Sequence, residues 1–155
     1  MGATYEVNRI SAELIDRAYP LVISAAPRLD LEGWRALCRN VVNREVHPLE
    51  LDDVFIASNS RSYIRGVCVA GGRIHALLGK VLDVRIFVLA SAADEPGVAA
   101  AMIEYLKSRA IQESCSYVRI WGTSTNDDWT KSLVRMMPWE NGILLPLEPD
   151  CDLQV

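Results

Sequence analysis

One segment of the sequence, residues 89–99, has the residue types and spacing of a site for an anionic group. The apolar run 81–89 is rich in β-branched residues and predicts a central strand, and a helical pattern begins at Pro96. A helix that starts close to a strand end directs its unpaired N–H groups and the positive end of its dipole into the gap beyond that strand. Small residues there would let phosphate groups reach the backbone, and we expect the donors to be the N–H groups of Gly97, Val98 and Ala99.

The same segment is also typical of an ordinary capped helix. Asp94 and Glu95 stand near the start of the helix, where carboxylates are favourable. Pro96 suits the first helical position, because its missing N–H would be unpaired there in any residue. A helix cap and an anion site do not exclude each other, so the sequence leaves both open.

Asp83 is the acidic residue of the predicted strand 81–89. Side chains alternate along a regular strand, so we expect Asp83 and Arg85 to share a face with Phe87 and Leu89. Asp83 is then either a general base or a residue at the strand start that pairs with a nearby arginine. Three basic residues on the preceding hairpin could contact an anion or form a solvated face: Arg61, Arg65 and Arg73.

The elements that must position these residues follow from the apolar periodicity. Strands are predicted over 5–10, 53–58, 63–69, 81–89, 117–121 and 142–147, and helices begin near Ser11, Asp30, Pro96 and Trp129. We expect Pro20 to break or kink the first helix, and the pair Gly71-Gly72 to form a turn. This order predicts an α/β fold with a mixed, mostly antiparallel sheet flanked by helices.

Composition limits the classes of function. The chain has 155 residues, half of them apolar, which fits one domain with a real core. Its net charge of -4 disfavours nucleic acid as a partner. The four cysteines and two histidines lack the spacing of a metal site, and we expect reduced thiols in a cytoplasmic protein. No apolar run is long enough to span a membrane.

The segment Asp94-Glu95-Pro96-Gly97-Val98-Ala99 resembles the pyrophosphate loop of the GNAT acetyltransferases, [Gln/Arg]-x-x-Gly-x-[Gly/Ala], which follows a central strand and opens a helix. That family continues with a strand, an asparagine and a short helix, as residues 117–121, Asn126 and 129–137 do here. The predicted order of elements agrees over nearly the full chain. The resemblance implies one GNAT-like domain over residues 1–155.

The resemblance also implies a function and a site. The function is transfer of an acyl group from acetyl-CoA, or another acyl-CoA, to a small-molecule or protein amine. Asp83 would be the catalytic base, and the acyl-CoA would be bound by the backbone of Phe87, Val88 and Leu89, by the N–H groups of Gly97, Val98 and Ala99, and by Asn126.

The chain departs from the family pattern at two positions. Asp94 stands where the family has glutamine or arginine, and Leu133 holds the register of a tyrosine that protonates the leaving thiolate. These departures define the alternative function: a catalytically degenerate domain of the same fold that binds CoA or a protein partner. In that case an open sheet edge at residues 143–147, favoured by Pro146, could form a homodimer surface.

Overall fold

The computed structural model describes residues 4–90, 94–123, 127–133 and 135–147. These residues form a seven-stranded sheet in the order β1-β2-β3-β4-β5-β7-β6. The strands are β1 (Glu6–Arg9), β2 (Asp53–Ser58), β3 (Ile64–His75), β4 (Gly79–Leu89), β5 (Tyr117–Trp121), β6 (Met137–Trp139) and β7 (Gly142–Pro146). Only β4 and β5 pair in parallel; every other neighbouring pair is antiparallel.

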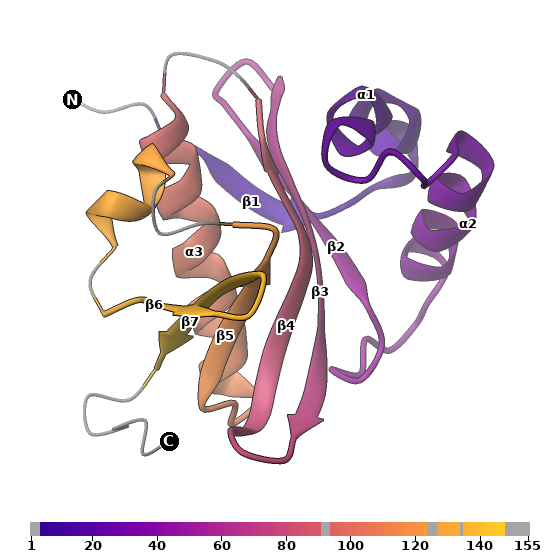
Figure 1. Ribbon diagram of the computed structural model, residues 1–155. Coiled ribbons are helices and arrows are strands. Elements are labelled where there is room, and N and C mark those ends of the chain that lie inside the picture. The colour runs from indigo at the N-terminus through magenta and orange to yellow at the C-terminus, as the bar shows by residue number, and fades with distance from the viewer. Residues whose placement is uncertain (1–3, 91–93, 124–126, 134, 148–155) are drawn as a thin grey trace.

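Helices cover both faces of this sheet (Figure 1). On one face lie the 3₁₀ helix η1 (Ala12–Leu14), α1 (Ile15–Ala25) and α2 (Leu31–Val42), and on the other lie α3 (Glu95–Gln112) and the 3₁₀ helix η2 (Asp128–Ser132). Strand residues alternate between the two cores. Val54 and Ile56 pack with the core of α1 and α2, whereas Phe55 packs with the core of α3. The mixed α/β sheet that the sequence predicted is confirmed.

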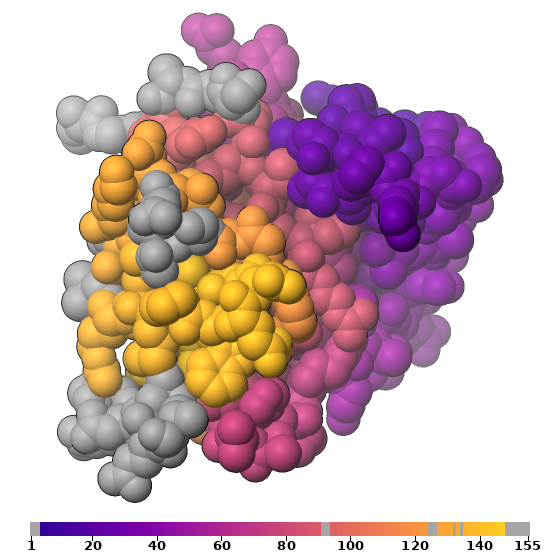
Figure 2. All heavy atoms as spheres, in the orientation of Figure 1, coloured from indigo at the N-terminus to yellow at the C-terminus, as the bar shows by residue number. Residues whose placement is uncertain are grey.

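The space-filling view shows the same division on the surface (Figure 2). The residues of α1 and α2 form a lobe at one side of the molecule, and the C-terminal strands lie over the other side. The strip between them is built mainly by β4, which no helix covers in this view.

Several sequence predictions about the helices are confirmed. Asp30 caps α2 by accepting a 2.7 Å hydrogen bond from the Gly33 N–H. Asp94 caps α3, and Pro96 lies in its first turn. We expected a break or a kink at Pro20; the break was wrong, because α1 continues through Pro20 to Ala25, and the kink stays a prediction. Ala18 and Val22 flank Pro20 and are fully buried, so packing on the sheet outweighs the one missing hydrogen bond.

The expected turn at Gly71-Gly72 was also wrong. Both glycines lie inside β3, and the chain turns after His75 instead, with Gly79 at a φ of 78°. A Cβ on Gly72 would lie 2.5 Å from Cγ of Leu49, and the Gly72 N–H donates to the Leu49 carbonyl. Gly72 therefore serves the close approach of the segment before β2, a tertiary requirement that resembles a turn signal in sequence.

The C-terminal part differs most from the prediction. The helix expected over 129–137 is only η2, and the edge strand β6 follows it. Strand β7 lies between β5 and β6, so the open sheet edge expected at 143–147 is closed by β6 at Ile143 and Leu144, whereas residues 145–147 extend beyond the described pairing with β6. Among the described strands the sheet ends at β1 and β6, and the homodimer surface expected at 143–147 stays a prediction.

Two β-bulges interrupt the central strands, and an arginine is the extra residue in each. In β3, Arg65 falls between the pairs Ser58↔Ile64 and Ala57↔Gly66. In β4, Arg85 falls between the pairs Ala70↔Val84 and Val69↔Ile86. A bulge shifts the alternation of side chains by one residue.

The Arg85 bulge corrects the expected placement of Asp83. Val84 and Phe87 both pack with the α3 core, and Ile86 packs with the core of α1 and α2. Asp83 therefore lies on the face of the sheet opposite to Phe87 and Leu89, and the expectation that the three share a face was wrong. The regular alternation assumed from sequence ends at the bulge.

Gly142→Ala is expected to lower the free energy of unfolding by about 1–3 kcal/mol. A Cβ at Gly142 would lie 2.1 Å from the carbonyl oxygen of Ile120, a backbone atom that cannot move without disturbing the β5–β7 pairing. Urea unfolding followed by circular dichroism measures the change. Asn141→Ala, at an exposed position in the neighbouring turn, is the control and should shift stability by less than about 0.5 kcal/mol. Equal stability of the two variants would contradict the close approach of β7 to β5.

Candidate functional site

The candidate site is the place where β4 and β5 separate. The two strands pair from Val81↔Tyr117 to Val84↔Ile120, and β5 then continues beside β7. Beyond Val84 no described strand pairs with β4 on the side of β5, whereas β3 stays paired with β4 on the other side up to Leu89. The backbone of the last residues of β4 therefore faces a gap with unused hydrogen-bonding groups.

A cleft of about 370 Å³ occupies this gap. Phe87 and Trp129 form part of its wall, with stacked rings whose centroids are 4.9 Å apart. Three residues that the sequence placed in the site, Phe87, Val88 and Leu89, thus lie together in one cleft beside the start of α3. The described residues that line it are Phe87, Val88, Leu89, Glu95, Gly122, Thr123, Asp127, Asp128 and Trp129.

The first turn of α3 is occupied by the side chain of Asp94. The Gly97 N–H donates to Oδ1 of Asp94 at 3.2 Å, and the Val98 N–H donates to the Asp94 carbonyl at 3.2 Å. A Cβ on Gly97 would lie 2.2 Å from Oδ2 of Asp94, so glycine is required for this cap. The capped-helix interpretation is confirmed. The anion site at Gly97, Val98 and Ala99 stays a prediction, and it requires the Asp94 carboxylate to move aside.

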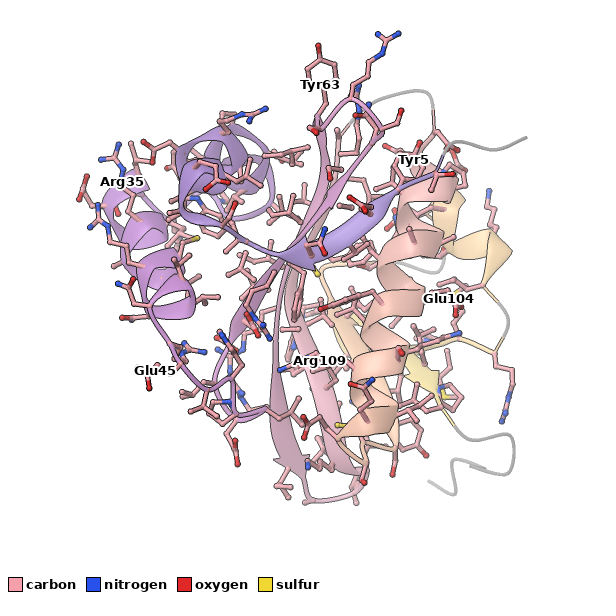
Figure 3. The ribbon with its side chains drawn as sticks, turned by 180° about the vertical axis from the view of Figure 1, so that it is seen from behind. Tyr5, Arg35, Glu45, Tyr63, Glu104 and Arg109 are labelled. Carbon is pink, nitrogen blue, oxygen red and sulfur yellow. The ribbon has the colours of Figure 1, made fainter. Side chains whose placement is uncertain are left out.

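Tyr5 holds Asp94 in this position, and the sequence did not indicate it. Its hydroxyl donates to Oδ2 of Asp94 at 2.7 Å, across a separation of 89 residues. This hydrogen bond, then burial and the charge of Asp94, raises the pKa of Tyr5 above its ordinary value. Figure 3 shows Tyr5 beside the end of α3 that lies nearest the tip of the β2–β3 hairpin, which Tyr63 marks. No local pattern could have identified this contact.

The Asp83 carboxylate contacts one residue of β5 and one residue of its own strand, β4. Oδ1 of Asp83 accepts a 2.6 Å hydrogen bond from Nε1 of Trp121, and Oδ2 lies 3.8 Å from Nε of Arg85. The arginine pair that the sequence allowed is therefore present. Asp83 does not line the described part of the cleft, but it stands opposite Arg119, one pair before the strands separate.

The remaining predicted residues are placed as follows. Asn126 lies outside the described residues. Leu133 follows η2 and packs against the core beneath α3, where a leucine side chain has no proton to donate. Within the described ranges, no cluster of His, Cys, Asp and Glu could hold a metal ion. In the same ranges, no helix has the length and apolar character needed to cross a membrane.

The sequence matches no protein-family model and no curated protein. The structure does resemble solved structures. An aminoglycoside N-acetyltransferase in complex with CoA superposes with a TM-score of 0.64 at 14% identity, over 84% of each chain. A glucosamine-6-phosphate N-acetyltransferase from Arabidopsis thaliana gives 0.61 at 10% identity, over 88% of this chain and 98% of that one.

A third similar structure is that of a named member of the GNAT family. An acetyltransferase of the GNAT family from Staphylococcus aureus Mu50 superposes with a TM-score of 0.62 at 8% identity, over 94% of this chain and 100% of that one. The fold expected from the half-matched loop and the order of elements is confirmed over most of the chain. The chain has the fold of the GNAT acetyltransferases.

Proposed function

We propose that the chain binds an acyl-CoA in the cleft between β4 and β5 and transfers its acyl group to an amine. The observation that carries this proposal is the separation of the two strands after Val84, which leaves the backbone of Phe87 to Leu89 without a strand partner on the β5 side, beside a 370 Å³ cleft. An amide-containing arm such as pantetheine can pair with such an edge as an added strand. Structural neighbours that are acetyltransferases support the same kind of reaction.

The roles of the chain's residues follow from this placement. The amine nitrogen attacks the thioester carbonyl carbon, the C–N bond forms as the C–S bond breaks, CoA leaves as its thiolate with the electron pair of that bond, and the amine loses a proton. Asp83 is the proposed acceptor of that proton, because it lies next to the separation point on the face that α3 does not cover. The acceptor is a small-molecule or protein amine, and the protein acts in the cytoplasm.

The charges around the cleft oppose an anionic ligand. Glu95, Asp127 and Asp128 line it, and no basic residue is among its described lining residues. Asp94 adds a carboxylate at the start of α3 and uses the Gly97 N–H. These observations favour a second candidate function, a domain of this fold that binds a ligand or partner without turnover. Leu133 at the proton-donor register favours it too.

Acetyl-CoA is expected to raise the unfolding temperature of the protein. A ligand at about a hundred times its dissociation constant adds ~2.7 kcal/mol of stability, roughly 5–10 °C in a domain of this size. Differential scanning fluorimetry with acetyl-CoA, free CoA and adenosine diphosphate as a control measures the shift. No shift at millimolar acetyl-CoA would reject the proposed function. The second candidate function, a domain that binds another ligand or a partner without turnover, would then remain.

Asp94→Asn should tighten acetyl-CoA binding by about tenfold, or ~1.4 kcal/mol, because it removes a negative charge from the first turn of α3 and keeps a capping oxygen. Isothermal titration calorimetry measures the dissociation constant. Asp30→Asn is the matched control, since Asp30 caps α2 in the same way. Weaker binding by Asp94→Asn, with Asp30→Asn unchanged, would mean that the carboxylate assists the ligand.

Asp83→Asn should lower the rate of acyl transfer by about a hundredfold or more, as expected for loss of a general base, with the affinity for acetyl-CoA unchanged. Release of free thiol in the presence of a panel of primary amines reports the rate. Asp52→Asn is the control, because Asp52 pairs with Arg73 and Arg85 on the same face and has no proposed role in the reaction. Equal rates for the two variants would remove Asp83 from the mechanism.

A further inference from the structure

A bound acyl-CoA needs a positive charge that its cleft does not contain. The described lining residues include three carboxylates and no basic side chain, and Asp94 adds a fourth carboxylate beside them. Phosphate groups are bound in proteins by cationic side chains together with backbone N–H groups. A cation on an element next to the start of α3 would offset these carboxylates.

Arg65 is next to this region through the backbone. Its carbonyl accepts a 2.9 Å hydrogen bond from the N–H of Ala90, the residue that follows β4. The next residue, Gly66, pairs with Leu89, which lines the cleft. Arg65 is thus fixed at the point where the chain leaves β4 toward α3.

The β3 bulge leaves Arg65 outside the regular alternation of side chains. Ile64 and Val67 both pack with the core of α1 and α2. Gly66 faces α3, since a Cβ there would lie 2.4 Å from Sδ of Met102. Arg65 is the extra residue between Ile64 and Gly66, which face opposite sides of the sheet. Its charge acts on the Tyr5 hydroxyl, which is bonded to Asp94 at the start of α3. Bulges of this kind re-aim side chains and are common beside active sites.

The charge of Arg65 acts on the Tyr5–Asp94 hydrogen bond, and Arg65 forms no ion pair with a described residue. It is among the groups acting on the Tyr5 hydroxyl, whose pKa it lowers against the larger opposing effect of Asp94. Its guanidinium lies 5.9 Å from the centre of the Tyr63 ring, and no ion pair of Arg65 occurs among the described residues. By contrast, Arg9, Arg85 and Arg119 each pair with a carboxylate.

We propose that Arg65 binds a phosphate group of the acyl-CoA and replaces the glutamine or arginine that Asp94 displaced from the loop. This inference rests on the proposed function and names a binding residue for it. The cation has moved from the loop to the bulged strand beside it. The Asp94 carboxylate and the phosphate compete for the same N–H groups at the start of α3. When the phosphate binds, it takes the place of the carboxylate near Arg65.

Arg65→Gln should weaken acetyl-CoA binding by about tenfold, which is 1.4 kcal/mol, as measured by isothermal titration calorimetry. Arg61→Gln is the matched control, because Arg61 is an exposed arginine of the same hairpin and carries no proposed contact. Arg65→Lys retains the charge and should bind between the wild type and Arg65→Gln. Equal unfolding temperatures of the three variants without ligand show that the hairpin is intact.

Dephospho-CoA identifies the phosphate. If Arg65 contacts the 3′-phosphate, Arg65→Gln loses its effect with dephospho-CoA; if it contacts the diphosphate, the effect persists. Either result supports the proposal. If the wild type binds acetyl-CoA and Arg65→Gln binds it with the same affinity, this inference is overturned and the proposed function is not. Absence of acetyl-CoA binding by the wild type overturns the proposed function, and this inference with it.

Discussion

The separation of β4 from β5 is the constraint on which the candidate site depends. Parallel pairing lasts for only four register pairs, from Val81↔Tyr117 to Val84↔Ile120. After that β5 is held by β7, where Gly142 packs directly on the backbone of Ile120. On the other side β4 stays paired with β3 and carries the Arg85 bulge just past the last shared pair. Each strand is retained by its other neighbour, so the gap between them is a stable feature of the fold.

A buried charged centre connects β1, β2 and α3. Asp53 of β2 is almost fully buried and accepts two hydrogen bonds from Nε of Arg9 in β1, with Arg109 of α3 at 3.7 Å. Both arginines also lie over the ring of Phe55, at 5.9 and 5.6 Å. Removal of one partner from a buried group of this kind leaves an uncompensated charge, which is strongly destabilising. Burial, followed by the charge of Arg9, lowers the pKa of the neighbouring His47 and favours its neutral form.

The sequence by itself determined the order of elements up to β5, most helix starts and the position of the site segment. The β-branched run 81–89 could only be a central strand, and Pro96 with Asp94 defined the start of α3. These features are local, because caps, proline geometry and apolar periodicity depend on residues a few positions apart. The same local signals placed Phe87, Val88 and Leu89 at the strand end that lines the cleft.

Only the tertiary structure decided how the site is charged and which face each side chain takes. The contact of Tyr5 with Asp94 spans 89 residues, and the position of β7 inside the sheet depends on pairing with both β5 and β6. The bulge at Arg85 places Asp83 and Phe87 on opposite faces, and a bulge shows in the register between two strands rather than in the composition of one. Local sequence fixes what a segment can form, but pairing between distant segments fixes which atoms meet, and the chemistry of this cleft belongs to the second kind of information.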